Sequence, residues 1–281
     1  MKAVIGVDGS KYSEWALGWL GEMPFRMAPR VTAIHAMDLQ SVRPSFIVQP
    51  VVSGYEPDEG EAIHILESRA KQVEAETKRR FVKLGIKGSV RIVQDKIAQA
   101  LIELAGHKGL IVVGSHGLDA IDRFMLGSVS TTVTLHASCP VLIVKEPPQT
   151  LRRLLVATDG SPSSKTALQF LVKQLAVNPK SKPLVILLVH VMPFLRYTMV
   201  KEAGEQLLAQ QAATLEQVGY RVRQIPCVGP AAEEIMKVAN REQPDLIVTG
   251  AKGRSAVTRF LQGSVSMKLV QQSPCSVLVV R

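Results

Sequence analysis

The chain has 281 residues, which is enough for two domains of ordinary size. Hydrophobic residues make up 46% and charged residues 21%, and no apolar run reaches the roughly 18 residues that a membrane span requires, so we expect a globular protein without a transmembrane segment. The net charge of +10 suits nucleic acid, an anionic membrane or a phosphorylated small molecule, but the one notable basic cluster, residues 78–80, is interpreted as the solvated face of a helix.

The first predicted element is a buried strand at residues 4–7 that leads into an Asp-Gly-Ser turn at 8–10 and a helix. It lacks the long apolar region and cleavage site of a signal peptide, so we expect the protein to stay in the cytoplasm. The same strand, turn and helix start return at 155–161 with identical spacing. Ser10 and Ser161 suit the N-cap of the helix in each copy.

The second strands, residues 31–36 and 186–191, also correspond, and we interpret the histidine in each as a hydrogen-bonded core residue. A long amphipathic helix follows each strand and ends at Gly85 or Gly219, as a C-terminal cap would. Copy one alone has a long segment before this helix, at about residues 38–60. Such a segment is either a functional lid or a disordered loop, and both interpretations stay open.

Short continuous runs of Val, Ile and Leu alternate with helices in the rest of each copy, which is typical of a parallel sheet covered on both faces. The fifth strands form short apolar edges, so we expect the two copies to pack against each other through them. Three cysteines without C-x-x-C spacing provide neither a disulfide framework nor a zinc site. The third, fourth and fifth runs are 89–93, 110–113 and 141–144 in copy one and 220–225, 246–248 and 277–280 in copy two.

A proline-containing stretch separates the two copies. Pro147 and Pro148 resist both helix and strand and predict a linker at residues 146–151. We therefore expect one domain at residues 1–145 and a second at residues 152–281.

A glycine motif with the pattern G-x-x-G-x9-G-S-V-S follows the fourth strand of both copies. Glycines let the backbone approach a ligand closely, and their N–H groups can surround phosphate oxygens. The Gly-Ser pair opens the next helix, whose N-terminus carries partial positive charge and free donors, so the motif predicts a phosphate site at the carboxyl ends of the strands. Its residues are Gly114, Gly117, Gly127, Ser128, Val129 and Ser130 in copy one and Gly250, Gly253, Gly263, Ser264, Val265 and Ser266 in copy two.

The paired Asp-Gly-Ser turns and the two glycine motifs resemble the universal stress protein family, and both halves of the chain match it. The resemblance implies an α/β fold with two tandem Rossmann-like domains. Each would have a five-stranded parallel sheet of order 3-2-1-4-5 with helices on both faces. It also implies ATP binding, because the ATP binders of the family keep the glycine motif and other relatives have lost it.

The resemblance also assigns residues to the ligand. Asp8 and Asp159 would contact the adenosine end, and Ala36 and Val191 would line the adenine pocket. The motif glycines and serines would hold the phosphates. Mg²⁺ or Mn²⁺ would bind through the phosphates, and no metal-ligating side chain is assigned. Pairing of the two domains within the chain, and further pairing into a homodimer, are implied as well.

Other interpretations of the same residues stay open. Asp8 and Asp159 also suit turns that precede helices, and the glycines suit tight turns. Arg123 and Arg259 occupy matching positions in the nine-residue stretch, where phosphate contact and a surface or interface role both fit.

The two copies differ around the predicted site. Copy one has Ala36 and Leu118 where copy two has Val191 and Arg254, and copy two also carries Lys252 in its glycine loop. A cation near phosphate strengthens binding, and a smaller wall residue loses apolar contact. We therefore expect site two to bind ATP more tightly, unless the long segment of copy one closes over site one.

The sequence predicts binding more readily than turnover. It contains no P-loop, dinucleotide-binding, zinc-protease or nucleophile-elbow motif, so no catalytic residue is assigned. We expect an ATP-binding stress or signalling protein. The alternatives are a weak ATPase and a structural adaptor whose nucleotide sites stay empty. A nucleic-acid role is not favoured, because neither a recognised motif nor an aromatic stacking pattern accompanies the positive charge.

Overall fold

The computed structural model describes residues 1–39, 59–94, 96–117, 126–177, 183–194, 197–253 and 264–281. The first half contains β1 (Lys2–Gly6), α1 (Lys11–Glu22), β2 (Arg30–Met37), α2 (Glu59–Lys83), β3 (Gly88–Gln94), α3 (Ile97–Ala105), β4 (Leu110–Gly114), α4 (Ser128–His136) and β5 (Val141–Val144). The second half contains β6 (Arg153–Ala157), α5 (Pro162–Gln174), β7 (Val185–Met192), α6 (Tyr197–Gln217), β8 (Arg221–Val228), α7 (Ala231–Glu242), β9 (Leu246–Gly250), α8 (Ser264–Gln272) and β10 (Ser276–Val280).

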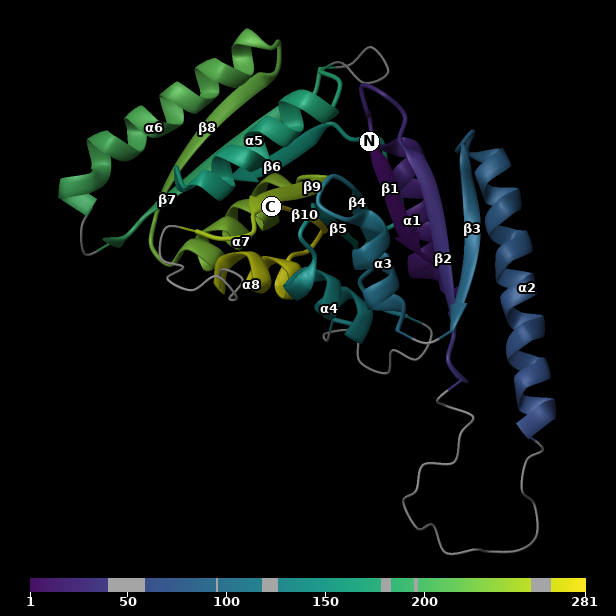
Figure 1. The fold of residues 1–281 in the computed structure, drawn as a ribbon. Helices are drawn as coiled ribbons and strands as arrows, with labels where there is room; N and C mark the ends of the chain where they lie inside the picture. The colour runs from purple at the N-terminus through teal and green to yellow at the C-terminus, as the bar shows by residue number, and fades with distance from the viewer. Residues whose placement is uncertain (40–58, 95, 118–125, 178–182, 195–196, 254–263) are drawn as a thin grey trace, which may run out of the picture.

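The described strands form one continuous sheet of order β3-β2-β1-β4-β5-β10-β9-β6-β7-β8 (Figure 1). Within each half every pair of neighbouring strands is parallel. The order in each half is therefore 3-2-1-4-5, which confirms the predicted fold class. A strand–helix–strand crossover in a parallel sheet must carry a helix over one face, and this explains why strands and helices alternate along the sequence.

The two halves meet where β5 pairs antiparallel with β10. The register joins Val141 to Val279, Leu142 to Leu278 and Ile143 to Val277. Each fifth strand thereby covers the apolar edge of the other, as the sequence predicts, because an unpaired edge exposes hydrogen-bonding groups. All residues of both strands are buried.

Two further contacts lie near the junction of the halves. Phe25 and Leu175, which lie beyond the ends of α1 and α5, form an isolated antiparallel bridge. The linker lies against α1, because the indole N–H of Trp19 donates to the Glu146 carbonyl at 2.9 Å. Around the bridge, the Arg26 N–H donates to the Gln174 carbonyl at 2.8 Å and the Ala176 N–H to the Pro24 carbonyl at 2.7 Å.

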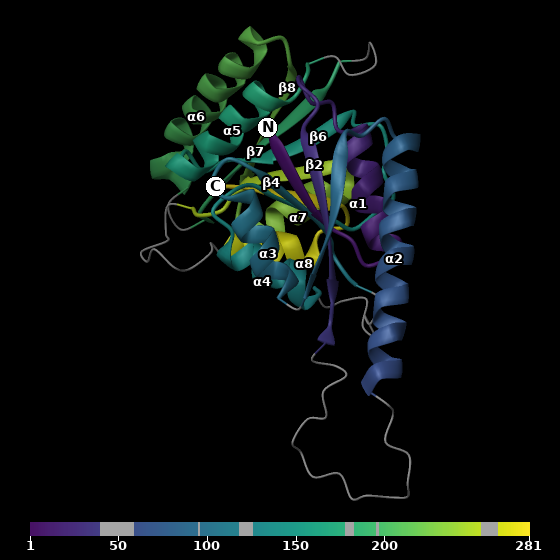
Figure 2. The ribbon, with the colours of Figure 1, turned by 45° about the vertical axis from the view of Figure 1, so that its right-hand side comes forward.

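Helices cover both faces of the sheet, which gives three layers (Figure 2). One core cluster packs α1, α2, α5 and α6 against one face, with the fully buried Trp19 and Leu171 among its members. The other packs α3, α4, α7 and α8 against the opposite face, with Leu101 and Leu269. Because central strands are buried on both sides, their sequences are continuous apolar runs rather than alternating ones.

The helix starts follow the predicted capping. The Ser10 hydroxyl accepts from the Ser13 N–H at 3.2 Å, and the Ser161 hydroxyl accepts from the Ser164 N–H at the same distance. Gly9 and Gly160 precede these caps with φ of 80° and 75°, a left-handed conformation that favours glycine. The Asp-Gly-Ser turns are therefore built alike in both halves.

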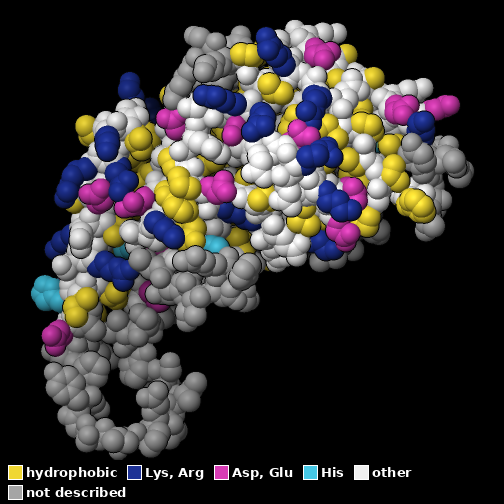
Figure 3. Space-filling model, turned by 180° about the vertical axis from the view of Figure 1, so that it is seen from behind, with side chains coloured by type: hydrophobic (Ala, Val, Ile, Leu, Met, Phe, Trp, Pro, Cys, Tyr) yellow, Lys and Arg dark blue, Asp and Glu magenta, His cyan; other side chains and the backbone are white. Residues whose placement is uncertain are grey.

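The surface carries both signs of charge. On the face seen in Figure 3, Lys and Arg side chains are scattered among Asp and Glu rather than gathered into one basic patch. No helix of the described residues is long and apolar enough to cross a bilayer.

Candidate functional site

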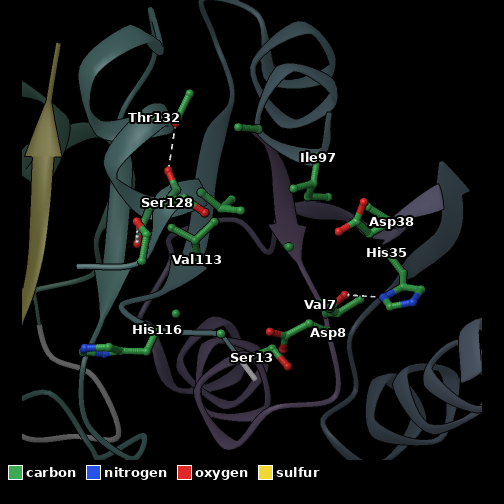
Figure 4. Close-up of a pocket in the computed structure, with 18 of the residues that line it drawn as sticks. Val7, Asp8, Ser13, His35, Asp38, Ile97, Val113, His116, Ser128 and Thr132 are labelled. Atoms are coloured by element: carbon green, nitrogen blue, oxygen red, sulfur yellow. Dashed lines mark hydrogen bonds between the residues drawn. The ribbon is translucent and has the colours of Figure 1, made fainter. Parts of the chain in front are cut away.

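A cavity of about 740 Å³ lies in the first half, at the carboxyl ends of β1, β2 and β4 (Figure 4). It has walls from both faces of the sheet, because α2 contributes on one side and α3 and α4 on the other. Ligands of open parallel sheets bind in such crevices. The predicted residues that line it are Asp8, Ala36, Gly114, Gly117, Gly127, Ser128, Val129 and Ser130.

Asp8 takes part in both the turn and the cavity. Its Oδ1 accepts from the Ser10 N–H at 2.9 Å, which is the turn role considered above. Its Oδ2 lies only 3.1 Å from where a Cβ would stand on Gly117. Asp159 forms the same turn in the second half: its Oδ1 accepts from the Ser161 N–H at 3.0 Å, and its Oδ2 lies 2.9 Å from where a Cβ would stand on Gly253. The second glycine of each G-x-x-G therefore makes room for the aspartate.

The first glycine of each motif allows close packing against a helix. A Cβ on Gly114 would stand 2.6 Å from the Tyr12 Cβ and 3.0 Å from the Tyr12 carbonyl carbon. A Cβ on Gly250 would stand 2.7 Å from the Ser163 carbonyl carbon. Since these neighbours include backbone of α1 and α5, the fold itself requires both glycines, independently of a ligand.

Gly127 differs from these glycines. Its φ is −61°, and the nearest atoms to an added Cβ, the Ser115 carbonyl oxygen and the Ser130 hydroxyl, would stand at 3.4 Å, which is ordinary contact. Neither backbone strain nor packing explains a glycine here. Gly127 is the N-cap of α4 and lines the cavity, so the free N–H groups of the first helical turn begin at this wall.

The two serines of the first motif have different surroundings. Ser130 is 2% exposed, and its hydroxyl is placed to donate to the Ser115 carbonyl at 3.1 Å and to the Gly127 carbonyl at 2.9 Å. It therefore holds the glycine loop to α4. Ser128 is exposed and lines the cavity at the start of α4 (Figure 4). Its hydroxyl is the one better placed to meet a ligand.

The β2 end of the cavity includes apolar side chains. Ala36 lines it together with Met37, Leu66 and Ile97. His35 is buried as predicted, and its Nδ1 lies 2.8 Å from the Val7 carbonyl oxygen. His35 also lines the cavity, which the core interpretation did not include. His190 repeats this hydrogen bond with the Thr158 carbonyl oxygen at 2.8 Å.

Several cavity residues were missed by the sequence reasoning. Arg69 comes from α2, Lys96 precedes α3, and Asp38 follows β2. Lys96 has a φ of 45°, which is uncommon for a residue with a Cβ. Only the shared position at the carboxyl ends of strands could have indicated Asp38 and Lys96, and nothing in the helical pattern singles out Arg69.

His116 stands at one side of the glycine loop. Its Nδ1 lies 2.9 Å from the Ser115 hydroxyl oxygen, and its ring centroid lies 5.0 Å from that of Tyr12. The imidazole points away from Asp8 and His35 in Figure 4. Its Nε2 is buried and has no hydrogen-bond partner among the described residues. Within the described ranges, no group of three His, Cys, Asp or Glu side chains could hold a metal ion.

The second half repeats the described part of this arrangement. The Ser266 hydroxyl is placed to donate to the Ala251 carbonyl at 3.1 Å, as Ser130 does to Ser115. Val191 is the penultimate residue of β7 and follows His190, as Ala36 is the penultimate residue of β2 and follows His35. Ser264 and Val265 begin α8. Outside the described residues lie Gly263, Leu118, Arg123, Arg254, Arg259 and nearly all of the 38–60 segment.

Comparisons with known proteins agree with this architecture. Residues 1–145 and 150–281 each match the model of the universal stress protein family. The chain is 29% identical to universal stress proteins of Mycolicibacterium smegmatis and Mycobacterium tuberculosis, over 99% of its own length and 96% of theirs. A crystal structure of a universal stress protein from Archaeoglobus fulgidus superposes with a TM-score of 0.71 at 21% identity, covering 99% of this chain and 98% of the other.

Proposed function

Since the chain belongs to the universal stress protein family, we propose that it binds ATP in both halves and acts as a nucleotide-dependent stress or signalling module. Its two nucleotide-binding domains would be residues 1–145 and 152–281. Occupancy would change the shape of the protein or its affinity for partners, rather than drive rapid turnover. The observation that carries the proposal is Gly127, a cavity-lining glycine at the start of α4 that neither its backbone angles nor its neighbours require.

The cavity suits a nucleotide in one orientation. The α4 N-terminus offers free N–H groups, partial positive charge and the Ser128 hydroxyl, which are the groups that bind phosphate. The opposite end, around Ala36 and Ile97, offers apolar surface to a base. Asp8 lies at the tip of β1, where its carboxylate would accept hydrogen bonds from ribose hydroxyls. Site two would use Asp159, Val191 and the second motif in the same way.

A divalent cation is compatible with this arrangement when it arrives on the nucleotide. The cavity has carboxylates at Asp8 and Asp38 but no described cluster of side chains that would bind a metal by itself. Mg²⁺ commonly binds through substrate phosphates and one or two carboxylates. We therefore propose that Mg²⁺ or Mn²⁺ enters with ATP and neutralises phosphate charge there.

Binding is favoured over catalysis by the chemistry of the lining. Rapid hydrolysis needs a group that orients the attacking water, together with cations on the transferred phosphate. Of the described residues at the phosphate end, Ser128 and Ser130 are hydroxyls, and Ser130 is engaged with the loop backbone. Any ATPase activity would be slow. A structural adaptor with empty sites remains the second candidate, and it predicts that nucleotide does not bind.

Two measurements test the proposal. Mass spectrometry of the purified protein should find an adenine nucleotide, and calorimetry should show ATP binding. A Gly127→Val side chain would enter the phosphate site and remove hydrogen bonds worth about 1–3 kcal/mol, so affinity at site one should fall at least about fivefold. Gly21→Val, on an exposed position of α1 away from the cavity, is the matched control and should bind as wild type. Unchanged affinity in folded Gly127→Val protein would refute the assignment of site one.

A further inference from the structure

The residue that follows each fifth strand lies against the opposite half of the molecule. Lys145 follows β5 and Arg281 follows β10. Continuing the antiparallel register places Lys145 opposite Cys275 and Arg281 opposite Cys139. The Lys145 N–H donates to the Ser276 hydroxyl at 3.1 Å, in agreement with this register. The chain has two basic residues at equivalent positions, and each reaches across the pseudo-twofold axis.

Both basic side chains bind near the carboxyl end of a motif helix in the other half. The Lys145 ammonium donates to the Ser273 carbonyl at 2.9 Å and to the Ser273 hydroxyl at 3.1 Å. Ser273 directly follows α8, and its N–H donates to the Leu269 carbonyl. The Arg281 guanidinium donates to the Thr134 carbonyl in the last turns of α4. These are the two helices whose N-termini carry the glycine-serine motifs.

A chain of hydrogen bonds continues from Arg281 to the glycine loop of site one. The Thr134 hydroxyl donates to the Ser130 carbonyl at 2.5 Å. The Ser130 hydroxyl in turn is placed to donate to the carbonyls of Ser115 and Gly127. Thr134 and Ser130 are 0% and 2% exposed, so water does not compete for these bonds. The last residue of the second half is thus connected to the cavity wall of the first.

The charges of the anchors match the polarity of the helices. A helix carries partial negative charge at its carboxyl end and partial positive charge at its amino end. A cation at the carboxyl end and an anionic ligand at the amino end of α4 are therefore both favourable. Burial of the two cations has an energetic cost, which lowers the pKa of Arg281 and lowers that of Lys145 to about 8. A short helix of nine residues held at one end has little freedom to move at the other.

We propose that Arg281 and Lys145 are reciprocal positioning residues: each half of the chain fixes the phosphate-binding helix of the other half. Arg281 sets the position of α4 and thus of site one, and Lys145 sets the position of α8 and thus of site two. The coupling to ligand rests on the proposed nucleotide function. The positioning of the helix ends does not.

The test uses the full chain and the variants Arg281→Met and Lys145→Met, which remove the charge and keep much of the apolar stem. Hydrogen exchange is followed by mass spectrometry while ATP is added. Peptides from Ser128–His136 report site one, and peptides from Ser264–Gln272 report site two. Each variant serves as the control for the other. Thermal unfolding shows whether either variant loses stability as a whole.

The expected result is a crossed pattern. Arg281→Met should raise the ATP concentration needed for half-maximal protection of α4 by about two- to fivefold, which is the range expected for a cation at a helix end. The ATP concentration needed for half-maximal protection of α8 should not change. Lys145→Met should do the reverse. Arg281→Lys, which keeps a cation, should restore part of the effect. A general loss of interface stability would shift both helices together, and such a result would overturn the proposal, as would no shift at either.

The two hypotheses fail in different ways. If ATP protects neither helix in the wild-type protein, the proposed function is wrong. The anchors are then judged without ligand: exchange at Thr131, whose N–H donates to the Gly127 carbonyl at 2.9 Å, should rise in Arg281→Met and not in Lys145→Met. Equal exchange in wild type and Arg281→Met would overturn the positioning role as well.

Discussion

At Gly114 and Gly127 the same residue type has different neighbours. Gly114 ends β4 against the backbone of Tyr12, so the sheet and α1 could not approach as they do with a Cβ between them. Gly127 has room for a Cβ and ordinary backbone angles. The sequence motif presents the two as equivalent, and only the structure separates a glycine that the packing requires from one that it does not.

Gly114→Ala should destabilise the protein. The added Cβ would stand 2.6 Å from the Tyr12 Cβ, and relief requires α1 to move, because Tyr12 backbone atoms lie at 3.0 and 3.1 Å. Overpacking of this kind costs about 1–3 kcal/mol. Urea unfolding measures the loss. Gly6→Ala at the end of β1 is the control, since its nearest contacts would be side-chain atoms at 3.5 and 3.6 Å. Equal stability of the two variants would contradict the packing explanation.

Lys145 should give the protein a pH-dependent stability. Burial lowers its pKa from 10.5 to about 8 in the folded state, while the unfolded chain keeps the ordinary value. Between these values the unfolded state binds more protons than the folded state, so stability rises with pH. Below about pH 8 the full cost of the buried charge is present; above the unfolded pKa it is absent.

Comparison with Lys145→Met isolates this contribution. The difference in unfolding free energy between wild type and variant should be constant below pH 7 and should shift in favour of wild type as the pH rises from 8 to 9.5. Chemical denaturation at a series of pH values measures it. The Cys275 thiol, whose pKa burial raises to about 12, contributes an opposite slope above pH 9, but it is present in both proteins and largely cancels in the difference. A difference that stays flat from pH 7 to 9.5 would show that Lys145 is not buried as described.

At the scale of elements, the strands were predictable because burial on both faces leaves a continuous apolar run, as in Val141–Val144. The capped starts of α1 and α5 were predictable from Ser10 and Ser161, whose hydroxyls act locally. The ends of α2 were less so. The sequence predicts an amphipathic helix here, but Ile63 in its second turn is 40% exposed, because the first turns of α2 extend past the carboxyl ends of the neighbouring strands (Figure 1). Which turns of such a helix are buried depends on where the helix lies relative to the sheet, and sequence periodicity does not show this.

The site was predictable where it depends on local motifs and not where it depends on packing. Asp8 and Ser128 line the cavity as their motifs suggest. Arg69 reaches it only because α2 lies over that end of the sheet, and Lys96 because of a left-handed turn that nothing in its sequence requires. The contributions of Gly263 and of the 38–60 segment stay predictions, since both lie at least largely outside the described residues.

The packing of the linker against α1 predicts that a side chain at Gly18 would displace the linker. A Cβ on Gly18 would stand 2.5 Å from the Pro148 Cγ, and the rigid proline ring cannot rotate away. Gly18→Ala should therefore lift the linker from α1 and weaken the Trp19 hydrogen bond to Glu146. Faster proteolysis and faster amide exchange at residues 146–151 would show it. Gly21→Ala, one turn along the helix and away from the linker, should leave both rates unchanged.

At the scale of the whole molecule, the fifth strands complete each other, so β3 and β8 are the remaining outer strands of the sheet. A homodimer, which stays a prediction, cannot form through β5 or β10 unless the pairing between these two strands is broken. It would have to use helices or the outer strands. β3 is largely exposed and β8 is partly exposed. Both carry arginines, Arg91 in β3 and Arg221 and Arg223 in β8, and charge discourages pairing of edges.

A fragment of residues 1–146 should associate through the strand that loses its partner. Without β10, the buried apolar edge of β5 is open, and a second copy of β5 is the nearest substitute. Sedimentation should show a concentration-dependent dimer, and amide exchange at Val141–Val144 should remain slow in it. Circular dichroism checks that the fragment is folded. A folded fragment that stays monomeric, with fast exchange in β5, would contradict this expectation.

The antiparallel contact between β5 and β10 also bears on how the two halves have been free to diverge. In a symmetric dimer of identical chains, one substitution at the axis appears on both sides at once, so both must tolerate it. Covalent fusion of two copies removes that restriction. Lysine stands at position 145 and arginine at the equivalent position 281, facing Cys275 and Cys139. Each half can thus acquire its own substitutions while β5 and β10 remain paired. An ancestral pair of equal sites can then become two sites with separate tasks.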